Sequence, residues 1–444
     1  MARTESKTPI WGVIAVLALL AVGANFLLRI LSDPASGMDF SIYRLGAMTI
    51  FDNEGFTQDL YSPTLNDHGM IKPPFTYPPF AAMLFLPFAF MPLVVGKVLM
   101  VLGSVVVAWW LSAIIYNYVN ARGRELPLQR YFGRVGTIAV LTLLVVAAGP
   151  WQRTIDLIQI NPFITALILA DFVRPATRVP RGVLIGIAGG VKLTPLVFGL
   201  LLLMRKDWKG LITTALSFAA TVGIAYLVVP QESTIYWFQA LRETSRVGWF
   251  SYFDNVSIMG TLTHAGLQHQ LTATALSTVQ VALTLLIVLV TAVLLIPLIR
   301  ARAVVSQLAL TAFMMLQISP ISWSHHNTWY PLMLAAVVVE IFPLFYRWAS
   351  SFIATLGVIT ASVALAGMYI SPYWIVLAFA PHFSSDNILM VPEGSLGLMA
   401  GTSPYQFMYV FTVVTFFVYL VHRQQINRAA AREGERVTAL GAAY

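Results

Sequence analysis

Long apolar stretches recur along this chain, and they limit its fold more than any other feature. A membrane-spanning helix needs about 20 mainly apolar residues, because the hydrocarbon core of a bilayer is about 30 Å thick. Ten stretches are candidates, at 10–31, 93–118, 131–149, 162–173, 210–229, 274–299, 303–320, 329–347, 350–372 and 405–422. Only 10% of the residues are charged, which is too few to wet the surface of a soluble domain. The sequence therefore predicts an all-α polytopic membrane protein with about ten full transmembrane helices.

One further apolar segment, 183–203, does not fit a simple crossing, because basic clusters flank both of its ends. Its centre contains Gly189-Gly190 and Pro195, which interrupt a helix, with Lys192 between them. We expect two short helices that enter the membrane and return. An ionisable residue inside such a segment is a functional candidate by default. Lys192 is expected either to bind an anionic group there or to snorkel to the cytoplasmic surface.

The charges between the apolar stretches predict the orientation. Arginine and lysine gather in alternate connections, which places those connections and both termini in the cytoplasm. The opposite side carries the long loops, including a large, acidic first extracytoplasmic loop at 32–77. Residues 1–422 are expected to form one transmembrane domain, and 423–444 a basic cytoplasmic tail. The net charge of +8 follows from this bias, and no continuous basic face with aromatic residues suggests nucleic acid as a partner.

The first outer loop contains the leading catalytic candidate. Asp39 follows the first apolar stretch, with Tyr43 and Arg44 close behind. A carboxylate at the edge of a low-dielectric site can act as a base, because burial raises its pKa towards neutrality. Tyr43 is expected to bind a sugar and Arg44 an anion. The alternative is a solvated loop acid with no catalytic role.

A second group of candidates lies on a short outer loop. His325 and His326 follow Trp323 between two apolar stretches. Histidine is suited to proton handling and to contact with phosphate near neutral pH. The alternatives are a metal site or a polar turn at the interface. The chain has no cysteine, which excludes disulfides and thiolate chemistry.

Other polar residues lie on the same predicted side. Gln159 and Asn161 have amide groups that pair well with sugar hydroxyls, although Asn161 could simply cap a helix that begins with Pro162. Arg242, Arg246 and Asn255 lie in the fourth outer loop among aromatic residues that suit either a sugar or an interfacial belt. Tyr77 precedes two prolines. The first role of this segment is expected to be structural, and Tyr77 and Trp323 are also candidates for substrate binding.

Five motifs in this order resemble glycosyltransferase family 87, of the GT-C class, over roughly residues 10–422. The motifs are Asp39-Phe40-Ser41-Ile42-Tyr43, Tyr77-Pro78-Pro79-Phe80, Gln159-Ile160-Asn161-Pro162, Gly190-Val191-Lys192-Leu193-Thr194-Pro195, and Ser319-Pro320-Ile321-Ser322-Trp323-Ser324-His325-His326. The family often has Asn-Gln-Ser in the fourth outer loop, whereas this chain has Asn255-Val256-Ser257, which lacks the glutamine.

The resemblance implies an inverting α-1,2-mannosyltransferase at the extracytoplasmic face of the cell membrane. Its donor would be polyprenyl-phosphate-mannose and its acceptor a mannose-containing glycolipid. Asp39 would be the base, and His325 or His326 would stabilise the departing phosphate. No metal or other cofactor is indicated, and no Asp-x-Asp site for a nucleotide sugar occurs on the outer loops. Two alternatives stay open: an arabinofuranosyltransferase that uses decaprenyl-phosphate-arabinose, and a lipid or sugar transporter.

Overall fold

Long helices form the framework of the protein. The computed structural model describes residues 10–33, 36–51, 59–67, 70–121, 125–174, 178–252 and 255–337, with 339, 359 and 369. Five helices in this part are long and apolar enough to cross a membrane: α1 (Ile10–Ser32), α5 (Leu93–Ala121), α6 (Leu128–Ala147), α11 (Trp208–Val228) and α15 (Ala273–Arg300). They match five of the predicted crossings in length and composition, and they confirm the polytopic, largely helical fold.

The other predicted crossings do not appear as single long helices in the described residues. The stretch at 162–173 forms α8 (Asn161–Val173), which follows α7 (Gly149–Leu157) across a 116° bend, so the two helices make either one broken span or a re-entrant loop. The stretch at 303–320 forms α16 (Val304–Ile318), whose 15 residues extend only about 22 Å. The stretch at 329–347 begins as α17 (Tyr330–Ala336). The predicted crossings 350–372 and 405–422 and the tail 423–444 lie outside the described residues.

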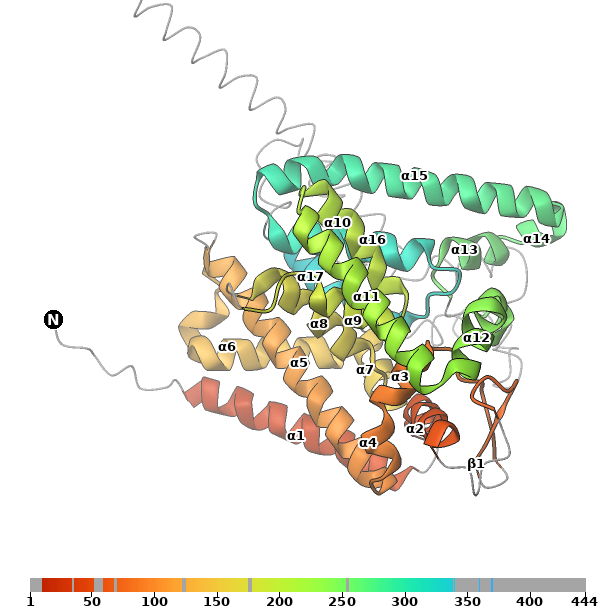
Figure 1. Ribbon diagram of the computed structural model, residues 1–444. Helices are drawn as coiled ribbons and strands as arrows, with labels where there is room; N and C mark the ends of the chain where they lie inside the picture. The colour runs from red at the N-terminus through yellow and green to blue at the C-terminus, as the bar shows by residue number, and fades with distance from the viewer. Residues whose placement is uncertain are drawn as a thin grey trace, which may run out of the picture.

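Short elements gather at one end of the long helices. The loop after α1 contains α2 (Met38–Phe51) and a hairpin of β1 (Leu65–Asp67) and β2 (Met70–Lys72), and it leads to α3 (Pro79–Leu84) and α4 (Leu86–Ala89). The loop before α15 contains α12 (Pro230–Phe238), η2 (Ala240–Arg242), η3 (Thr244–Arg246), α13 (Ile258–His264) and α14 (Leu267–Gln270). On the right of Figure 1 these elements lie together, whereas α15 joins α16 at the opposite side. The first outer loop is thus folded rather than irregular.

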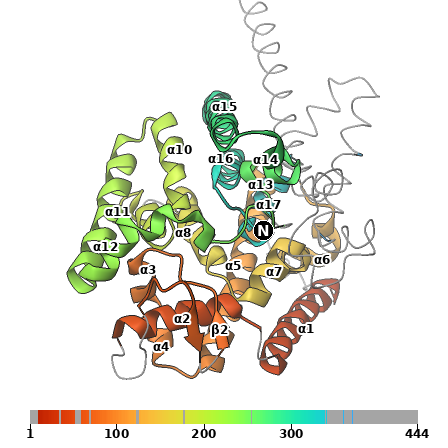
Figure 2. The same cartoon turned by 90° about the vertical axis from the view of Figure 1, so that its right-hand side faces the viewer.

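The long helices leave apolar side chains uncovered. Leu17 of α1, Leu216 of α11 and Leu285 of α15 are all more than half exposed. Large apolar side chains exposed along long apolar helices are typical of contact with lipid rather than water. In the turned view, α10, α11 and α12 lie on the opposite side from α1 and α6, with α5 and α8 between them (Figure 2).

The segment at 183–203 forms the predicted pair of short helices. The first is α9 (Val183–Val191), and the second is η1 (Thr194–Val197) followed by α10 (Phe198–Met204). Gly182, just before α9, packs against Gly210 at the start of α11, and Gly190 packs against Thr221 further along it. α10 then leads through residues 205–207 directly into α11. Both ends of the hairpin therefore lie at the same end of α11, and residues 192–193 form its tip.

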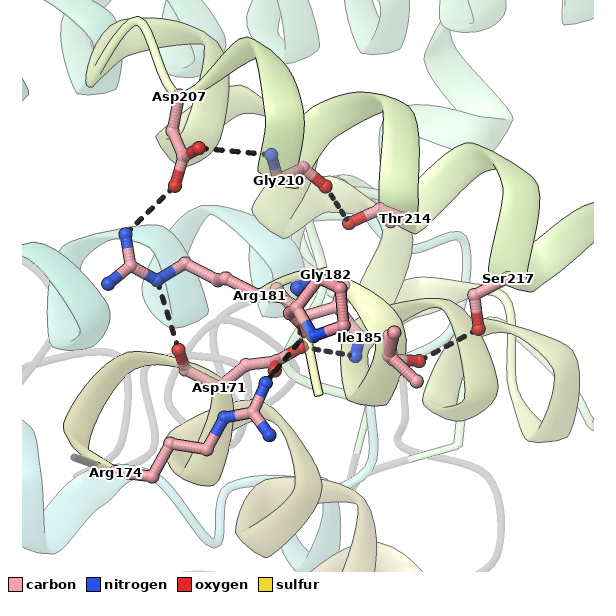
Figure 3. Close-up of polar contacts among 11 residues, drawn as sticks. Asp171, Arg174, Arg181, Gly182, Ile185, Asp207, Gly210, Thr214 and Ser217 are labelled. Atoms are coloured by element: carbon pink, nitrogen blue, oxygen red, sulfur yellow. Dashed lines mark hydrogen bonds and ion pairs between the residues drawn. The ribbon is translucent and has the colours of Figure 1, made fainter. Parts of the chain in front are cut away.

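A buried carboxylate fastens the base of this hairpin (Figure 3). Asp171, near the end of α8, accepts the backbone N–H groups of Gly182 at 3.0 Å and Ile185 at 2.9 Å. Its other oxygen pairs with Arg174 at 2.8 Å. The carboxylate satisfies backbone donors that the first turn of α9 would otherwise leave unpaired. It thereby joins α8 to α9 where the hairpin begins.

Candidate active site

Asp39 lies in the first turn of α2. Carboxylates are favoured at helix N-termini, because the backbone N–H groups there carry partial positive charge. Burial raises the pKa of Asp39 to about 7, and the nearby charges of Arg153 and Lys192 oppose this rise. A carboxyl group with this pKa is poised to exchange a proton near neutral pH. The sequence placed Asp39 on a loop; the structure places it on a helix, close enough to Arg153 of α7 and to Lys192 at the hairpin tip to interact with both charges.

A chain of hydrogen bonds begins one helical turn after Asp39. The Tyr43 hydroxyl donates to the Gln159 amide oxygen at 2.7 Å and lies 3.0 Å from the Tyr77 hydroxyl. The Asn161 amide donates to the same Gln159 oxygen at 3.3 Å. These contacts connect α2, the loop before α3 and the bend between α7 and α8. Four residues that the sequence placed among the binding candidates thus meet in one network.

Lys192 enters this network from the tip of the hairpin. Its ammonium group donates to the Asn161 side-chain oxygen at 3.1 Å and lies 5.6 Å from the centre of the Tyr77 ring. A cation above an aromatic face is stabilised by the ring quadrupole. The side chain therefore points into the polar cluster rather than back towards the basic ends of the hairpin, and its binding of an anionic group stays a prediction. The charge remains inside the polar cluster.

The backbone of the histidine pair is held from α7 and α8. His325 and His326 belong to η4 (Ser324–His326). The His325 carbonyl accepts the Thr154 hydroxyl at 2.7 Å and the Asn161 amide at 3.2 Å. The His325 ring nitrogen Nε2 lies 3.4 Å from the Gln159 amide nitrogen. These contacts place the histidines beside the same residues that hold Lys192.

The two imidazoles are neutral at physiological pH. Burial lowers the pKa of His325 and His326, and the positive charge of Lys192 lowers both pKa values further. The Trp323 backbone N–H donates to His326 Nδ1 at 3.3 Å, which assigns the proton of a neutral ring to Nε2. His326 can therefore donate one hydrogen bond from Nε2 without carrying a charge.

A pocket opens beside these groups. Its polar lining includes Asn161, Lys192, Thr194, Ser319 and His326. Ile164, Met315, Leu316 and Trp329 provide apolar lining. Such a mixture of a few convergent polar groups and apolar walls is typical of a small-ligand site. A lysine and a neutral N–H donor side by side suit an anionic group.

Several predicted binding residues lie apart from this cluster. The guanidinium group of Arg44 donates to the backbone carbonyls of Phe88 at 3.0 Å and Ala89 at 3.4 Å, and so fastens α4. Arg242 is exposed on η2. Arg246 donates to the Ser62 carbonyl at 3.1 Å. These three arginines do not line the pocket that the described residues form.

Asn255, in the fourth outer loop, supports the histidine segment through its pairing with Trp323. The two residues form an antiparallel bridge. The fully buried Asn255 side chain accepts the backbone N–H groups of Ser322 at 3.0 Å and Ser257 at 3.2 Å. Its amide donates to the Phe250 carbonyl at 3.2 Å. In this arrangement Asn255 holds the backbone before η4, while its use as a sugar ligand remains a prediction.

Arg153 was not among the candidates predicted from the sequence. This residue is exposed on α7, directly before Thr154, which contacts η4, and shortly before Asp156, which contacts the turn before α2. Its charge acts on both Asp39 and His325. Among the described residues its guanidinium has no hydrogen bond or ion pair. One sequence signal could have identified Arg153. It is a basic residue in a predicted outer turn, whereas lysine and arginine are generally enriched on the cytoplasmic side.

In the described part of the chain, no group of three or more His, Asp or Glu side chains is arranged to hold a metal ion. The site's polar contacts are instead made by amides, hydroxyls, imidazoles and cations. The reaction that these groups suit best is one with an anionic leaving group and a proton to remove.

Comparisons with known proteins found one matching family and several similar mannosyltransferases. A model of glycosyltransferase family 87 matches residues 75–320. A polyprenol-phosphate-mannose-dependent alpha-(1-2)-phosphatidylinositol mannoside mannosyltransferase of Mycobacterium tuberculosis (strain ATCC 25618 / H37Rv) is 29% identical over 338 residues, which are 74% of this chain and 76% of that protein. A polyprenol-phosphate-mannose-dependent alpha-(1-2)-phosphatidylinositol pentamannoside mannosyltransferase of Mycolicibacterium smegmatis (strain ATCC 700084 / mc(2)155) is 29% identical over 344 residues, 75% of this chain and 76% of the relative. No solved structure matches the chain.

Proposed function

Because the chain belongs to glycosyltransferase family 87, we propose that it transfers mannose from polyprenyl-phosphate-mannose to a mannose-containing lipid glycan in an α-1,2 linkage. The observation that carries the proposal is the single polar cluster in which Asp39, the Lys192 hairpin tip and the histidine segment converge. The names of the relatives favour a mannosyl over an arabinosyl donor. The same names favour an enzyme over a transporter.

Asp39 acts as the general base in this mechanism. Its carboxylate removes the proton of an acceptor hydroxyl, and the oxygen attacks the anomeric carbon of the donor sugar. The bond between that carbon and the phosphate oxygen breaks, and polyprenyl phosphate leaves with the electron pair. Attack from the face opposite the leaving group inverts the configuration, so that a β-linked donor yields an α-linked product.

Lys192 and His326 bind the departing phosphate. Both line the same pocket, and groups aimed at the place where charge develops stabilise a transition state more than a ground state. Lys192 contributes charge, and His326 contributes the Nε2–H donor that its contact with Trp323 leaves available. Tyr43, Gln159 and Asn161 keep these two groups in place through the network that joins α2 to the bend before α8.

The membrane topology is also part of this proposal. In the proposed topology the chain crosses the membrane ten times and adds two short hairpin helices, so that both termini are cytoplasmic and the site lies at the extracytoplasmic face of the cell membrane. The hydrophobic tail of the donor remains in the bilayer, which explains why the enzyme is embedded there. The acceptor is a glycolipid in the same leaflet, of the phosphatidylinositol mannoside class that the relatives are named for.

A transfer assay in reconstituted vesicles tests this function. The purified chain is given radiolabelled polyprenyl-phosphate-mannose, decaprenyl-phosphate-arabinose or GDP-mannose, each with phosphatidylinositol mannosides. We expect labelled glycolipid from the first donor alone, and release of the label by an α-1,2-mannosidase. Transfer from the arabinosyl donor alone would replace the proposal with its alternative, and absence of transfer from every donor would overturn it.

The orientation in the membrane is tested separately by cysteine labelling. The chain contains no native cysteine, so an introduced cysteine is the only site that reacts. Single cysteines are introduced as Gln268→Cys in α14 and Tyr444→Cys in the tail, and intact cells are treated with a membrane-impermeant maleimide. We expect labelling of the first variant and protection of the second until the cells are opened. The reverse pattern would contradict the extracytoplasmic placement.

A further inference from the structure

The mechanism above leaves one buried cation without a role. Lys97 is the fifth residue of α5, and only 4% of it is exposed. Its ammonium group donates to the Ser36 backbone carbonyl at 2.6 Å. A lysine buried on a membrane-crossing helix is unfavourable unless its charge is used. Its hydrogen-bond partner is a backbone atom in the connection between α1 and α2.

That connection makes a tight turn against two other helices. Gly37 has a positive φ of 71°, which glycine adopts without strain. A Cβ atom at Gly37 would lie 2.6 Å from Ile158 Cδ1 and 3.4 Å from Lys97 Cε. The Gly37 N–H donates to the Asp156 carbonyl at 2.8 Å. The turn is thus held by α5 on one side and by α7 on the other.

The anchor on α7 is itself fixed. The Asp156 carboxylate pairs with Arg29 at the end of α1, at 2.9 Å. The Ser41 backbone N–H then donates to the Gly37 carbonyl at 3.0 Å, which forms the first turn of α2. Asp39 lies within that turn. The direction of its carboxylate therefore depends on how residues 36 and 37 are held.

We propose that Lys97 is a positioning residue for Asp39: by holding the Ser36 carbonyl, it fixes the first turn of α2 and so keeps the carboxylate near the charges of Arg153 and Lys192. The inference rests on the proposed role of Asp39 as the base. Lys97 itself does not touch the reacting atoms. An alternative is that Lys97 acts only through its charge, because Asp33 and Lys72 lie close enough to interact with it electrostatically.

A kinetic comparison separates position from charge. Lys97→Met removes both the donor and the charge, Lys97→Gln keeps a donor without charge, and Lys97→Arg keeps both. Lys72→Met is the matched control, since it removes a neighbouring charge but not the contact to Ser36. We expect Lys97→Met to lower kcat at least roughly tenfold, since small displacements of a catalytic group have large effects, while donor KM changes by less than about twofold.

The variants then give opposite results under the two explanations. If position matters, Lys97→Arg restores most of kcat, Lys97→Gln restores part of it, and Lys72→Met resembles the unchanged protein. If only charge matters, Lys97→Gln is as impaired as Lys97→Met, and the proposal is overturned. Unchanged kcat in Lys97→Met overturns it as well.

A second measurement does not depend on activity. Asp39→Cys provides a single cysteine whose rate of reaction with a water-soluble maleimide reports how residue 39 is oriented. We expect Lys97→Met to change this rate severalfold and Lys72→Met to leave it unchanged; equal rates in all three proteins contradict the positioning role. If Lys97→Met does not fold, Lys97→Gln is compared instead, and a smaller change of the labelling rate is expected because this variant keeps a donor.

The two measurements distinguish the failure of each idea. If Asp39→Asn retains full turnover, the base role fails, yet a changed labelling rate still demonstrates that Lys97 orients residue 39. If Asp39→Asn is inactive and the labelling rate is unchanged, the base role stands and the positioning role fails.

Discussion

The ammonium group of Lys192 donates to the side-chain oxygen of Asn161 across 3.1 Å, and this contact joins the tip of the hairpin to the first residue of α8. The nine residues of α9 extend about 14 Å from its base, roughly half the thickness of the hydrocarbon core. The hairpin therefore brings a cation deep into the protein without a full crossing. Its length, together with the Asp171 anchor, sets where the charge lies.

Replacement of Asp39 by Asn tests the base directly. The amide keeps the size of the side chain but cannot accept the proton, so we expect turnover to fall at least about 100-fold while expression and thermal stability in detergent are retained. The measurement is transfer of radiolabelled mannose to glycolipid. Asp59→Asn, an exposed acid of the same outer loop, is the control and should transfer normally. Full activity in Asp39→Asn would rule out the base role.

The pH dependence of turnover should report the same group. Because burial raises the pKa of Asp39 to about 7, and the base is active when deprotonated, activity should increase as pH rises through about 7. The charge of Arg153 holds this pKa down. Arg153→Gln should therefore move the rising limb to higher pH, whereas Arg153→Lys should leave it close to its original position. A shift to lower pH in Arg153→Gln would contradict this electrostatic arrangement.

Substitution of His326 should lower turnover more than substitution of an ordinary histidine at the membrane interface. His326→Ala removes the Nε2–H donor from the pocket, and we expect turnover to fall at least about tenfold, within the range seen when one transition-state donor is lost. His326→Gln keeps an N–H group at a similar reach and should retain more activity than the alanine variant. His269→Ala, at an exposed site on α14, provides the control. Equal turnover of all four proteins would leave His326 a structural residue.

The Asp171 anchor predicts a stability effect at a distance from the pocket. Asp171→Ala leaves two backbone N–H groups and Arg174 without the carboxylate that satisfies them, which should lower stability by about 2–3 kcal/mol. Thermal unfolding in detergent measures this change. Turnover should also fall, because α9 no longer holds Lys192 at a fixed depth. Arg178→Ala, an exposed residue in the same connection, should unfold at the original temperature.

Much of the architecture follows from local properties of the chain. Five apolar stretches became long helices because apolar length alone satisfies the requirement for crossing a bilayer. The break around Lys192 was predictable from Gly189, Gly190 and Pro195, which weaken a helix wherever they occur. Asp39 and the histidine pair were recognisable as candidates, because ionisable groups beside apolar stretches are unfavourable unless they are used.

The composition of the site was decided only by tertiary packing. Tyr43 and Gln159 are 116 positions apart, and Asn161 and His325 are 164 positions apart, so no local pattern indicates which of them meet. Arg44 looked like an anion ligand beside Asp39, yet its place on α2 turns it towards the carbonyls of α4. Arg153 and Lys97 gave little signal, because their importance comes from the elements that surround them.

The sequence by itself determined which segments prefer lipid and which side chains are chemically capable of the reaction, since both depend on residue type and short-range order. Only the tertiary structure decided which capable groups converge, because a helix presents each side chain in one direction and that direction acquires a partner when helices pack. The Asp39 carboxylate shows the difference. Its chemistry is a property of the residue, whereas its pKa and its orientation come from α5, α7 and the hairpin tip.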